Sequence, residues 1–214
     1  MAFHRILNPS RRTVLAGGVI AALAAAVPAI AEALAGAALV QVLKAGGYVI
    51  VMRHAASPRE TPAAEAAAEG NAKRERQLDA DGVRTAVAMG QALKTLAIPI
   101  GEVWSSPTFR ALQTARFMAL PTPRTAGDLG DGGQSMQAAA AGQTNWLKSR
   151  ASERPRAGAN TILITHFPNI NAALGAQAAG VADGEALIFK PGDGGAELVG
   201  RIKIEDWPEL AAHR

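Results

Sequence analysis

Residues 46–54 read Gly46-Gly47-Tyr48-Val49-Ile50-Val51-Met52-Arg53-His54. The run from Tyr48 to Met52 is aromatic, β-branched or Met throughout, which is the composition of a strand buried on both faces. A glycine pair precedes this run and two basic side chains follow it. Because ligands of open α/β sheets bind outside the carboxyl ends of the strands, Arg53 and His54 are predicted to lie where such a sheet carries out its chemistry.

A second segment, residues 103–110, ends in a similar way. It reads Val103-Trp104-Ser105-Ser106-Pro107-Thr108-Phe109-Arg110 and is predicted to be a short strand that turns directly into a helix. Ser106 suits the N-cap of that helix and Pro107 its first position, which puts Arg110 in the first turn.

A third segment, residues 161–168, carries the second internal histidine. Thr161-Ile162-Leu163-Ile164-Thr165-His166 is an apolar run closed by a histidine, and Pro168 opens another helix. The three segments together predict that two arginines and two histidines meet at one sheet edge, beside helix N-termini. Such an arrangement binds anions, because unpaired backbone N–H groups and the positive ends of helix dipoles favour negative charge.

These motifs resemble those of the histidine phosphatase superfamily, in the phosphoglycerate mutase-like branch with short chains. The resemblance rests on Arg53-His54-Ala55, on Ser105-Ser106-Pro107-x-x-Arg110-Ala111-x-Gln113-Thr114-Ala115 and on His166. The family usually has Gly where Ala55 stands, and the Asn it often carries a few residues later is missing. The resemblance implies that the chain hydrolyses phosphomonoesters through a phosphohistidine on His54, with the phosphate held by Arg53, Arg110 and His166.

General chemistry suggests the same roles for these residues. A neutral imidazole such as His54 can attack phosphorus and divide a very slow hydrolysis into two easier steps. The guanidinium groups of Arg53 and Arg110 match phosphoryl oxygens, and His166 is a further donor as charge shifts in the transition state. Ser106 is expected to support the substrate-binding set and not to be the nucleophile, because no Gly-x-Ser-x-Gly turn surrounds it.

The proton donor for the leaving group is predicted among three carboxylates. The resemblance points to the loop after the helix of Arg110, and therefore to Asp128 or Asp131. Glu185, just before a late strand, is the third candidate. We expect no cofactor and no metal, because the arginines and histidines already supply positive charge and the sequence has no clustered acids to hold an ion.

The remaining pattern predicts an α/β protein, with residues 32–214 forming a single domain. We expect a three-layer α/β/α sandwich with a mostly parallel central sheet and helices on both faces. A polar loop over residues 55–77 is predicted either to cover the sheet edge or to be an ordinary surface insertion. Helices are predicted over residues 32–45, 79–97, 134–148 and 168–178, and a final hairpin over residues 186–190 and 197–204.

The helix over residues 79–97 gives the clearest helical pattern. Asp79 suits its N-cap, and a strand on each side completes a predicted β-α-β unit of residues 47–53, 79–97 and 102–105. The side chains predicted to face the core are Val83, Val87, Gly90, Leu93 and Leu96.

Residues 1–31 have the composition of a bacterial export signal of the twin-arginine type. They contain three arginines and no acid, and Arg11-Arg12 precedes an apolar run over residues 14–30. Ala29-Ile30-Ala31 offers a cleavage site. We therefore expect a periplasmic or secreted protein that uses the twin-arginine export machinery and meets the membrane only through its leader before cleavage; an uncleaved N-terminal anchor is the alternative.

Charge and composition exclude several classes of function. The chain has 22 basic and 18 acidic residues, and the basic total falls to 19 once the leader is removed. No basic run or aromatic platform supports nucleic-acid binding, and the lack of cysteine excludes disulfide and thiol chemistry. The expected partner is a phosphorylated small molecule or envelope component. A phosphomutase and a non-catalytic binder of phosphorylated envelope components are the alternative functions.

Overall fold

The computed structural model describes residues 1–2, 34–131 and 139–213. The predicted export signal and its cleavage site lie outside the described residues, as do the first residues of the helices predicted over 32–45 and 134–148. Across the part of the chain that the structure describes, no helix combines the length and the apolar character needed to cross a bilayer.

A mixed sheet forms the centre of the domain, with strand order β3-β2-β4-β1-β5-β6 among the described residues. The first four strands in that order run parallel, whereas β5 is antiparallel to β1 and β6 to β5. The mostly parallel sheet and the final hairpin are therefore confirmed. The strands are β1 (Val49–Arg53), β2 (Ile100–Ser105), β3 (Arg124–Thr125), β4 (Asn160–Thr165), β5 (Ala186–Lys190) and β6 (Glu197–Ile202).

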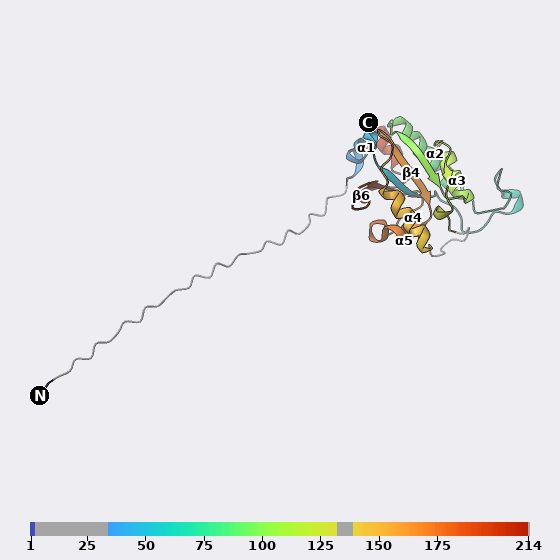
Figure 1. Ribbon diagram of the computed structural model, residues 1–214. Coiled ribbons are helices and arrows are strands. Elements are labelled where there is room, and N and C mark those ends of the chain that lie inside the picture. Colours follow the sequence, from blue (N-terminus) through green and yellow to red (C-terminus); the bar gives the residue numbers. More distant parts are fainter. Residues whose placement is uncertain (3–33, 132–138, 214) are drawn as a thin grey trace. The chain divides into compact units, whose positions relative to one another are not determined.

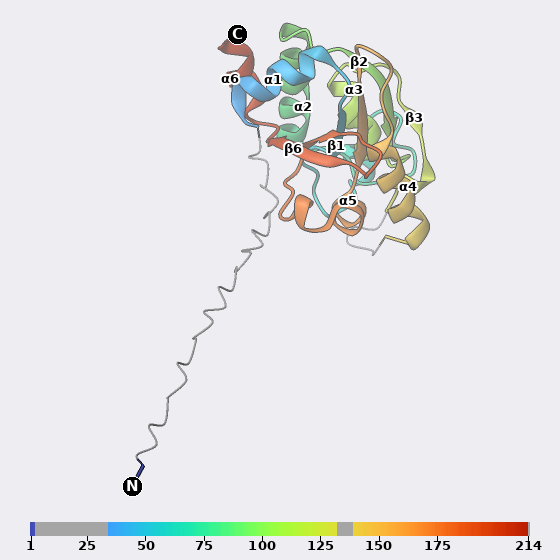
Figure 2. The same cartoon turned by 60° about the vertical axis from the view of Figure 1, so that its left-hand side comes forward.

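Helices cover both faces of this sheet (Figures 1 and 2). Met52 and Ile50 of β1 belong to one core, with α1, α2, α3 and α6, while Val49 and Val51 belong to the other, with α4 and α5. The alternation along one strand confirms the predicted three layers. The helices are α1 (Gly36–Ala45), α2 (Ala80–Thr95), α3 (Phe109–Phe117), α4 (Ala141–Ser152), α5 (Phe167–Leu174) and α6 (Trp207–Ala212), with short 3₁₀ turns η1 (Ala64–Ala66), η2 (Gly127–Leu129) and η3 (Gly175–Ala178).

Strands β1 and β4 explain the continuous apolar runs of the sequence, since both are central. All six residues of β4 are buried, as are the first four of β1. The two strands pair in parallel, with Arg53 opposite Thr165. Strand β4 also separates β1 from β2, so the predicted β-α-β unit spans a strand that comes later in the chain.

Helix α2 begins as predicted but faces the core differently. The Asp79 carboxylate accepts the Gly82 N–H at 2.7 Å, which confirms the predicted cap. The prediction that Val87 is buried is wrong, because this side chain is 48% exposed. The reason is that the helix packs against neighbouring backbone through two glycines. A Cβ on Gly82 would lie 2.1 Å from the Ala56 oxygen, and a Cβ on Gly90 would lie 2.1 Å from the Met118 oxygen. The helix therefore turns its glycines toward neighbouring backbone.

Helix α3 begins later than predicted. Its N-cap is Thr108, so the assignment of Ser106 as N-cap and Pro107 as first helical residue is wrong by two residues. The Ser106 hydroxyl instead accepts the Thr108 N–H at 3.2 Å and lies 3.0 Å from the Thr108 hydroxyl. This turn leaves Ser106 at the end of the strand, facing the site described below.

Candidate active site

The three strand ends meet because hydrogen bonds continue the parallel pairing past β1 and β2. The His54 N–H donates to the Thr165 oxygen at 3.0 Å, and the Ser106 N–H to the Ile164 oxygen at 2.9 Å. His166 follows Thr165 directly. The His54 and His166 ring centroids are 5.2 Å apart, and both side chains are buried. The predicted convergence of the three segments is therefore present in the structure.

Arg110 lies at the centre of this cluster and is fully buried. Its Nε donates to His54 Nε2 at 3.1 Å, while its Nη2 lies 3.1 Å from His166 Nδ1 and 2.5 Å from Asp131 Oδ2. Its Nη1 is buried without a hydrogen-bond partner among the described residues. A buried donor left unpaired is unfavourable, so the arginine has capacity for a further oxygen acceptor.

Hydrogen bonds fix the tautomer of His54. Its Nδ1 lies 2.8 Å from the Ala55 oxygen, which can only accept, so Nδ1 carries the proton. Its Nε2 faces a guanidinium donor and therefore carries the lone pair. Burial lowers the pKa of His54 to about 3; the Ala55 bond opposes this shift, whereas Arg110, Arg53 and Arg76 add to it. The ring is thus neutral near pH 7, in the form that can act as a nucleophile.

His166 has the opposite tautomer. Its Nδ1 faces Arg110 Nη2, which only donates, so Nε2 carries the proton and lies 2.8 Å from the Ser106 hydroxyl and 3.3 Å from that of Thr108. Burial, then the charges of His54 and the arginines, lower the pKa of His166 far below its usual range. Ser106 therefore acts on the cluster through its hydrogen bond to His166, whose imidazole it orients.

Polar side chains of α3 hold the backbone that follows His54 in place. The Thr114 hydroxyl donates to the Arg110 carbonyl at 2.9 Å, one helical turn earlier, and accepts the Ala55 N–H at 3.1 Å. Gln113 accepts the Leu78 N–H at 2.8 Å. The helix that carries Arg110 is consequently tied to the segment that carries the nucleophile candidate.

Arg53 lies at the rim and not in the buried centre. Its side chain is 26% exposed, its Nη2 lies 2.8 Å from Asp183 Oδ1, and its guanidinium carbon lies 5.9 Å from the Phe167 ring centroid. The Arg53 Nε has no hydrogen-bond partner among the described residues. The sequence analysis did not anticipate Asp183, which is far from the motifs along the chain.

The structure brings together the cluster and one of the three candidate acids. Asp131 is buried, and its Oδ2 is 2.5 Å from Arg110 Nη2 and 3.5 Å from His166 Nδ1. The carboxylate of Asp128 makes no hydrogen bond or ion pair with a described residue, although its backbone oxygen accepts from Asn169 at 3.1 Å. Asp131 is therefore the acid whose carboxylate contacts the predicted site.

The structure places the carboxylate of Glu185, the third candidate proton donor, in contacts away from the cluster. Its two oxygens form a paired salt bridge with Arg201 at 2.8 and 2.9 Å, and one of them accepts the Ala182 N–H at 2.8 Å. Burial acts to raise the pKa of Glu185, but these bonds outweigh it and the pKa is lowered. These contacts are with Arg201 and Ala182 and not with the histidine and arginine cluster, so Glu185 links the start of β5 to β6.

Arg76 is a site residue that the sequence analysis missed. It is buried, and it donates to the Pro58 oxygen at 2.5 Å and to the Ser57 oxygen at 2.8 Å. Burial and then the charge of Arg110 lower its pKa, and its own charge lowers the pKa values of both histidines. A third guanidinium therefore adds to the positive potential of the site. Its position in the predicted covering loop, directly before the capped helix α2, was the available signal.

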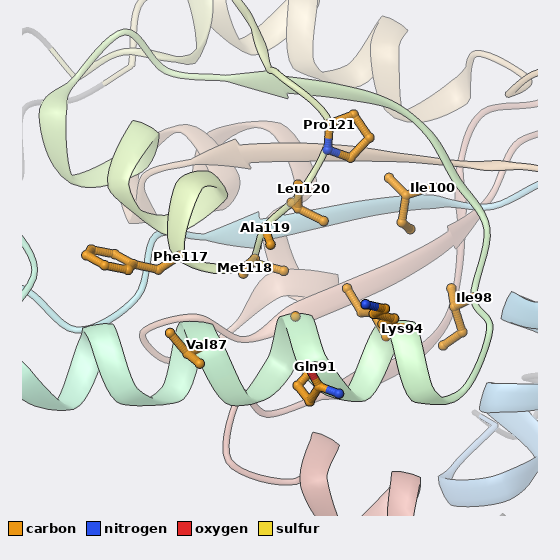
Figure 3. Close-up of a pocket in the computed structure, with 12 residues that line it drawn as sticks. Val87, Gln91, Lys94, Ile98, Ile100, Phe117, Met118, Ala119, Leu120 and Pro121 are labelled. Carbon is orange, nitrogen blue, oxygen red and sulfur yellow. The ribbon is translucent and has the colours of Figure 1, made fainter.

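A separate hollow of about 320 Å³ lies between α2 and the segment after α3 (Figure 3). Val87, Gln91 and Lys94 line one side, and residues 117–121 line the other. Lys94 is the one charged residue in its lining, and the hollow shares no residue with the histidine and arginine cluster. Apart from Gln91 and Lys94 its lining is apolar residues and glycine, and it includes no histidine or carboxylate, so the cluster is the better candidate for phosphate chemistry.

Within residues 34–131 and 139–213, no three or more His, Cys, Asp or Glu side chains are grouped so that they could hold an ion. The positive charge that the described residues bring to the cluster comes from Arg110, Arg53 and Arg76.

Comparisons with known proteins agree with this architecture. Residues 49–126 match the family model of the histidine phosphatase superfamily (branch 1). The protein histidine phosphatase SixA, solved with tungstate, aligns with a TM-score of 0.54 and 17% identity over 74% of this chain and 98% of its own. A protein from Agrobacterium tumefaciens that carries the SixA name aligns with a TM-score of 0.50 and 16% identity, over 73% of this chain and 97% of its own. No curated protein matches the chain by sequence.

Proposed function

We propose, on the premise that the chain belongs to the histidine phosphatase superfamily, that it hydrolyses phosphomonoesters through a phosphohistidine on His54. The observation that carries the proposal is the state of this side chain. His54 is buried, neutral and held in the tautomer whose Nε2 lone pair faces Arg110. A basic cluster with an uncharged imidazole beside Arg110 suits attack on a phosphorus atom whose oxygens are bound by the cations.

In the first step, His54 Nε2 forms a bond to phosphorus while the bond from phosphorus to the ester oxygen breaks. Arg110 and Arg53 bind the phosphoryl oxygens, and Arg76 adds positive potential. A dianionic phosphate also favours protonation of His166 at Nδ1, which then donates to an oxygen. The leaving oxygen takes its proton from Asp131, the candidate acid in contact with the cluster, which binds that proton from water when the phosphate takes its place on Arg110.

In the second step, water attacks the phosphohistidine and the bond from nitrogen to phosphorus breaks. The Asp131 carboxylate takes a proton from that water, and inorganic phosphate leaves. The guanidinium groups supply the charge stabilisation that a metal ion supplies in other phosphatases, so we propose that the reaction needs no metal. Ser106 is a positioning residue, because it acts through His166.

The substrate we propose is a phosphorylated small molecule or envelope component outside the cytoplasm. This part rests on the leader: a twin-arginine signal over residues 1–31 would deliver a folded chain to the periplasm or the medium. The twin-arginine machinery is accordingly the export partner in this proposal.

The mechanism is tested with a generic aryl phosphate in buffer without added metal. We expect the wild-type protein to release phosphate, and His54→Ala to lower turnover by more than about 10³-fold, because the nucleophile is lost. His213→Ala is the matched control, since His213 is exposed near the C-terminus, and it should retain full activity. Acid quenching should trap an acid-labile phosphoprotein that His54→Ala does not form.

Two results would contradict this mechanism. One is full activity of His54→Ala, and the other is loss of wild-type activity when a chelator is added. Phosphate binding without turnover on any of a broad set of phosphorylated metabolites would favour the non-catalytic binder instead.

A further inference from the structure

The Asp131 carboxylate occupies a position suited to a phosphoryl oxygen. Its Oδ2 lies 2.5 Å from Arg110 Nη2 and 3.5 Å from His166 Nδ1. The proposed function assigns these same two groups to the phosphate. Carboxylate and phosphoryl oxygens accept the same charge-assisted hydrogen bonds, so both cannot take up this position together.

The backbone that carries Asp131 is held in place by side chains of the surrounding elements. The Thr165 hydroxyl donates to the Leu129 oxygen at 2.7 Å, and the side-chain amides of Asn169 and Gln143 donate to the Gly130 oxygen at 3.0 and 2.8 Å. These three donors come from β4, α5 and α4. The backbone just before Asp131 is therefore anchored, and rotation of the side chain is the simplest way for its carboxylate to leave Arg110.

The arginines of the cluster also have N–H donors that the carboxylate does not pair with. Arg110 Nη1 is buried and unpaired among the described residues, although the same guanidinium already contacts His54, His166 and Asp131. Arg53 Nε is likewise unpaired. A carboxylate has two oxygens and lies in a plane, whereas a tetrahedral oxyanion has four, so the surplus of donors matches the larger anion.

We propose that Asp131 is a built-in occupant of the phosphoryl site, which the phosphate of the substrate displaces. In the free protein the carboxylate neutralises Arg110. When phosphate binds, the carboxylate turns away from the like-charged ligand, takes a proton from water and delivers it to the leaving oxygen. Competition of this kind lowers the apparent affinity for phosphate by the fraction of molecules in which Asp131 has withdrawn. The inference rests on the proposed function for the identity of the anion. It adds that the Asp131 carboxylate first competes with the phosphate for Arg110 and then acts as the proton donor.

The test compares the binding of inorganic phosphate and of tungstate by calorimetry in three proteins. Asp131→Asn keeps the shape of the side chain and removes its charge, so we expect phosphate to bind at least about tenfold more tightly than to the wild type. Asp128→Asn removes the same charge from the same loop and is the matched control. Its phosphate affinity should stay within about twofold of wild type, because its carboxylate is not paired with the pocket and is screened by solvent. Equal or weaker phosphate binding by Asp131→Asn overturns the proposal.

A crystal structure of the wild-type protein with tungstate gives a second measurement that needs no variant. We expect tungstate on Arg110 and the Asp131 carboxylate out of hydrogen-bond range of it; an intact pair beside bound tungstate overturns the proposal. The outcomes also separate the two proposals. If Asp131→Asn binds phosphate more tightly but His54→Ala stays fully active, the phosphohistidine mechanism alone is refuted. If activity depends on His54 but Asp131→Asn binds phosphate no more tightly than the wild type, only the proposal that Asp131 occupies the phosphoryl site is refuted.

Discussion

His54 and His166 are uncharged, although they lie among arginines that attract anions. Burial removes the water that would solvate an imidazolium, and the nearby arginines repel the extra proton. The same surroundings that would bind a phosphate therefore keep the nucleophile candidate free of a proton. At the scale of single residues, anion binding and nucleophile activation have one physical origin.

This coupling predicts a pH-dependent stability. The pKa of His54 falls from 6.5 to about 3 on folding, so between these pH values the unfolded chain binds more protons than the folded one. The free energy of unfolding should therefore fall as the pH falls through this window, by up to about 1.4 kcal/mol per pH unit for this group. The stability is fully present above pH 6.5, where both states are unprotonated.

Urea denaturation at pH 7 and pH 5 checks this prediction. His54→Asn should lose less stability between the two pH values than the wild type, because its side chain does not titrate. His213→Asn replaces an exposed histidine and should behave like the wild type. Equal losses in the wild type and His54→Asn would contradict the account of His54.

At the scale of elements, α2 sets how closely its neighbours can approach. Gly82 and Gly90 lie where a Cβ would be 2.1 Å from backbone oxygens of other segments. A helix interior ordinarily disfavours glycine, so these positions trade helical propensity for close packing. The approach at Gly82 involves Ala56, two residues after His54, which ties the helix to the site.

Gly90→Ala should destabilise the protein although alanine is the better helix former. Its Cβ would overlap the Met118 oxygen, and we expect the free energy of unfolding to drop by about 1–3 kcal/mol, as in overpacked cores. Gly142→Ala is the control, because a Cβ on this residue of α4 would have no neighbour within 4 Å. It should raise stability by up to about 1 kcal/mol. Urea denaturation measures both; a stabilised Gly90→Ala would show that this contact is not tight.

At the scale of the whole molecule, the register of the parallel strands assembles the site. Arg53 pairs opposite Thr165, and Ser105 opposite Ile164. Groups separated by more than a hundred residues in sequence are therefore brought to one sheet edge by backbone hydrogen bonds. The site should form only when the sheet is complete, which is compatible with the proposed export of a folded chain.

A further prediction for the whole chain concerns its N-terminus, where residues 1–31 are the proposed export signal. If residues 1–31 act as the proposed export signal, mass spectrometry of the secreted fraction should find Glu32 at or near the N-terminus, since Ala29-Ile30-Ala31 is the predicted small-residue cleavage site. Replacing both Arg11 and Arg12 by Lys keeps the charge and should block export, because the twin-arginine machinery recognises the paired arginines. An exported protein that begins at Met1 or Ala2 would identify an uncleaved anchor.

The sequence alone was enough to predict the strands β1, β2 and β4, the sandwich and the convergence of two histidines and two arginines. Buried central strands are continuous apolar runs, and the groups that follow them must lie at the sheet edge, so both can be inferred locally. Asp183 and Arg76 could not be inferred in this way, and Asp131 could be named only as one of three candidate acids. Loops and turns have no period, and their side chains are placed by contacts with distant segments.

The strand order and the orientation of α2 were also decided by the tertiary structure. Strand β4 comes late in the chain yet lies between β1 and β2, and Val87 fits a helical stripe yet faces solvent. Periodicity reports which residues share a face but not which neighbour that face meets. The chain thus determined by itself which groups are available for phosphate chemistry, and only the folded molecule determined which carboxylate contacts them, because that contact depends on packing between elements far apart in sequence.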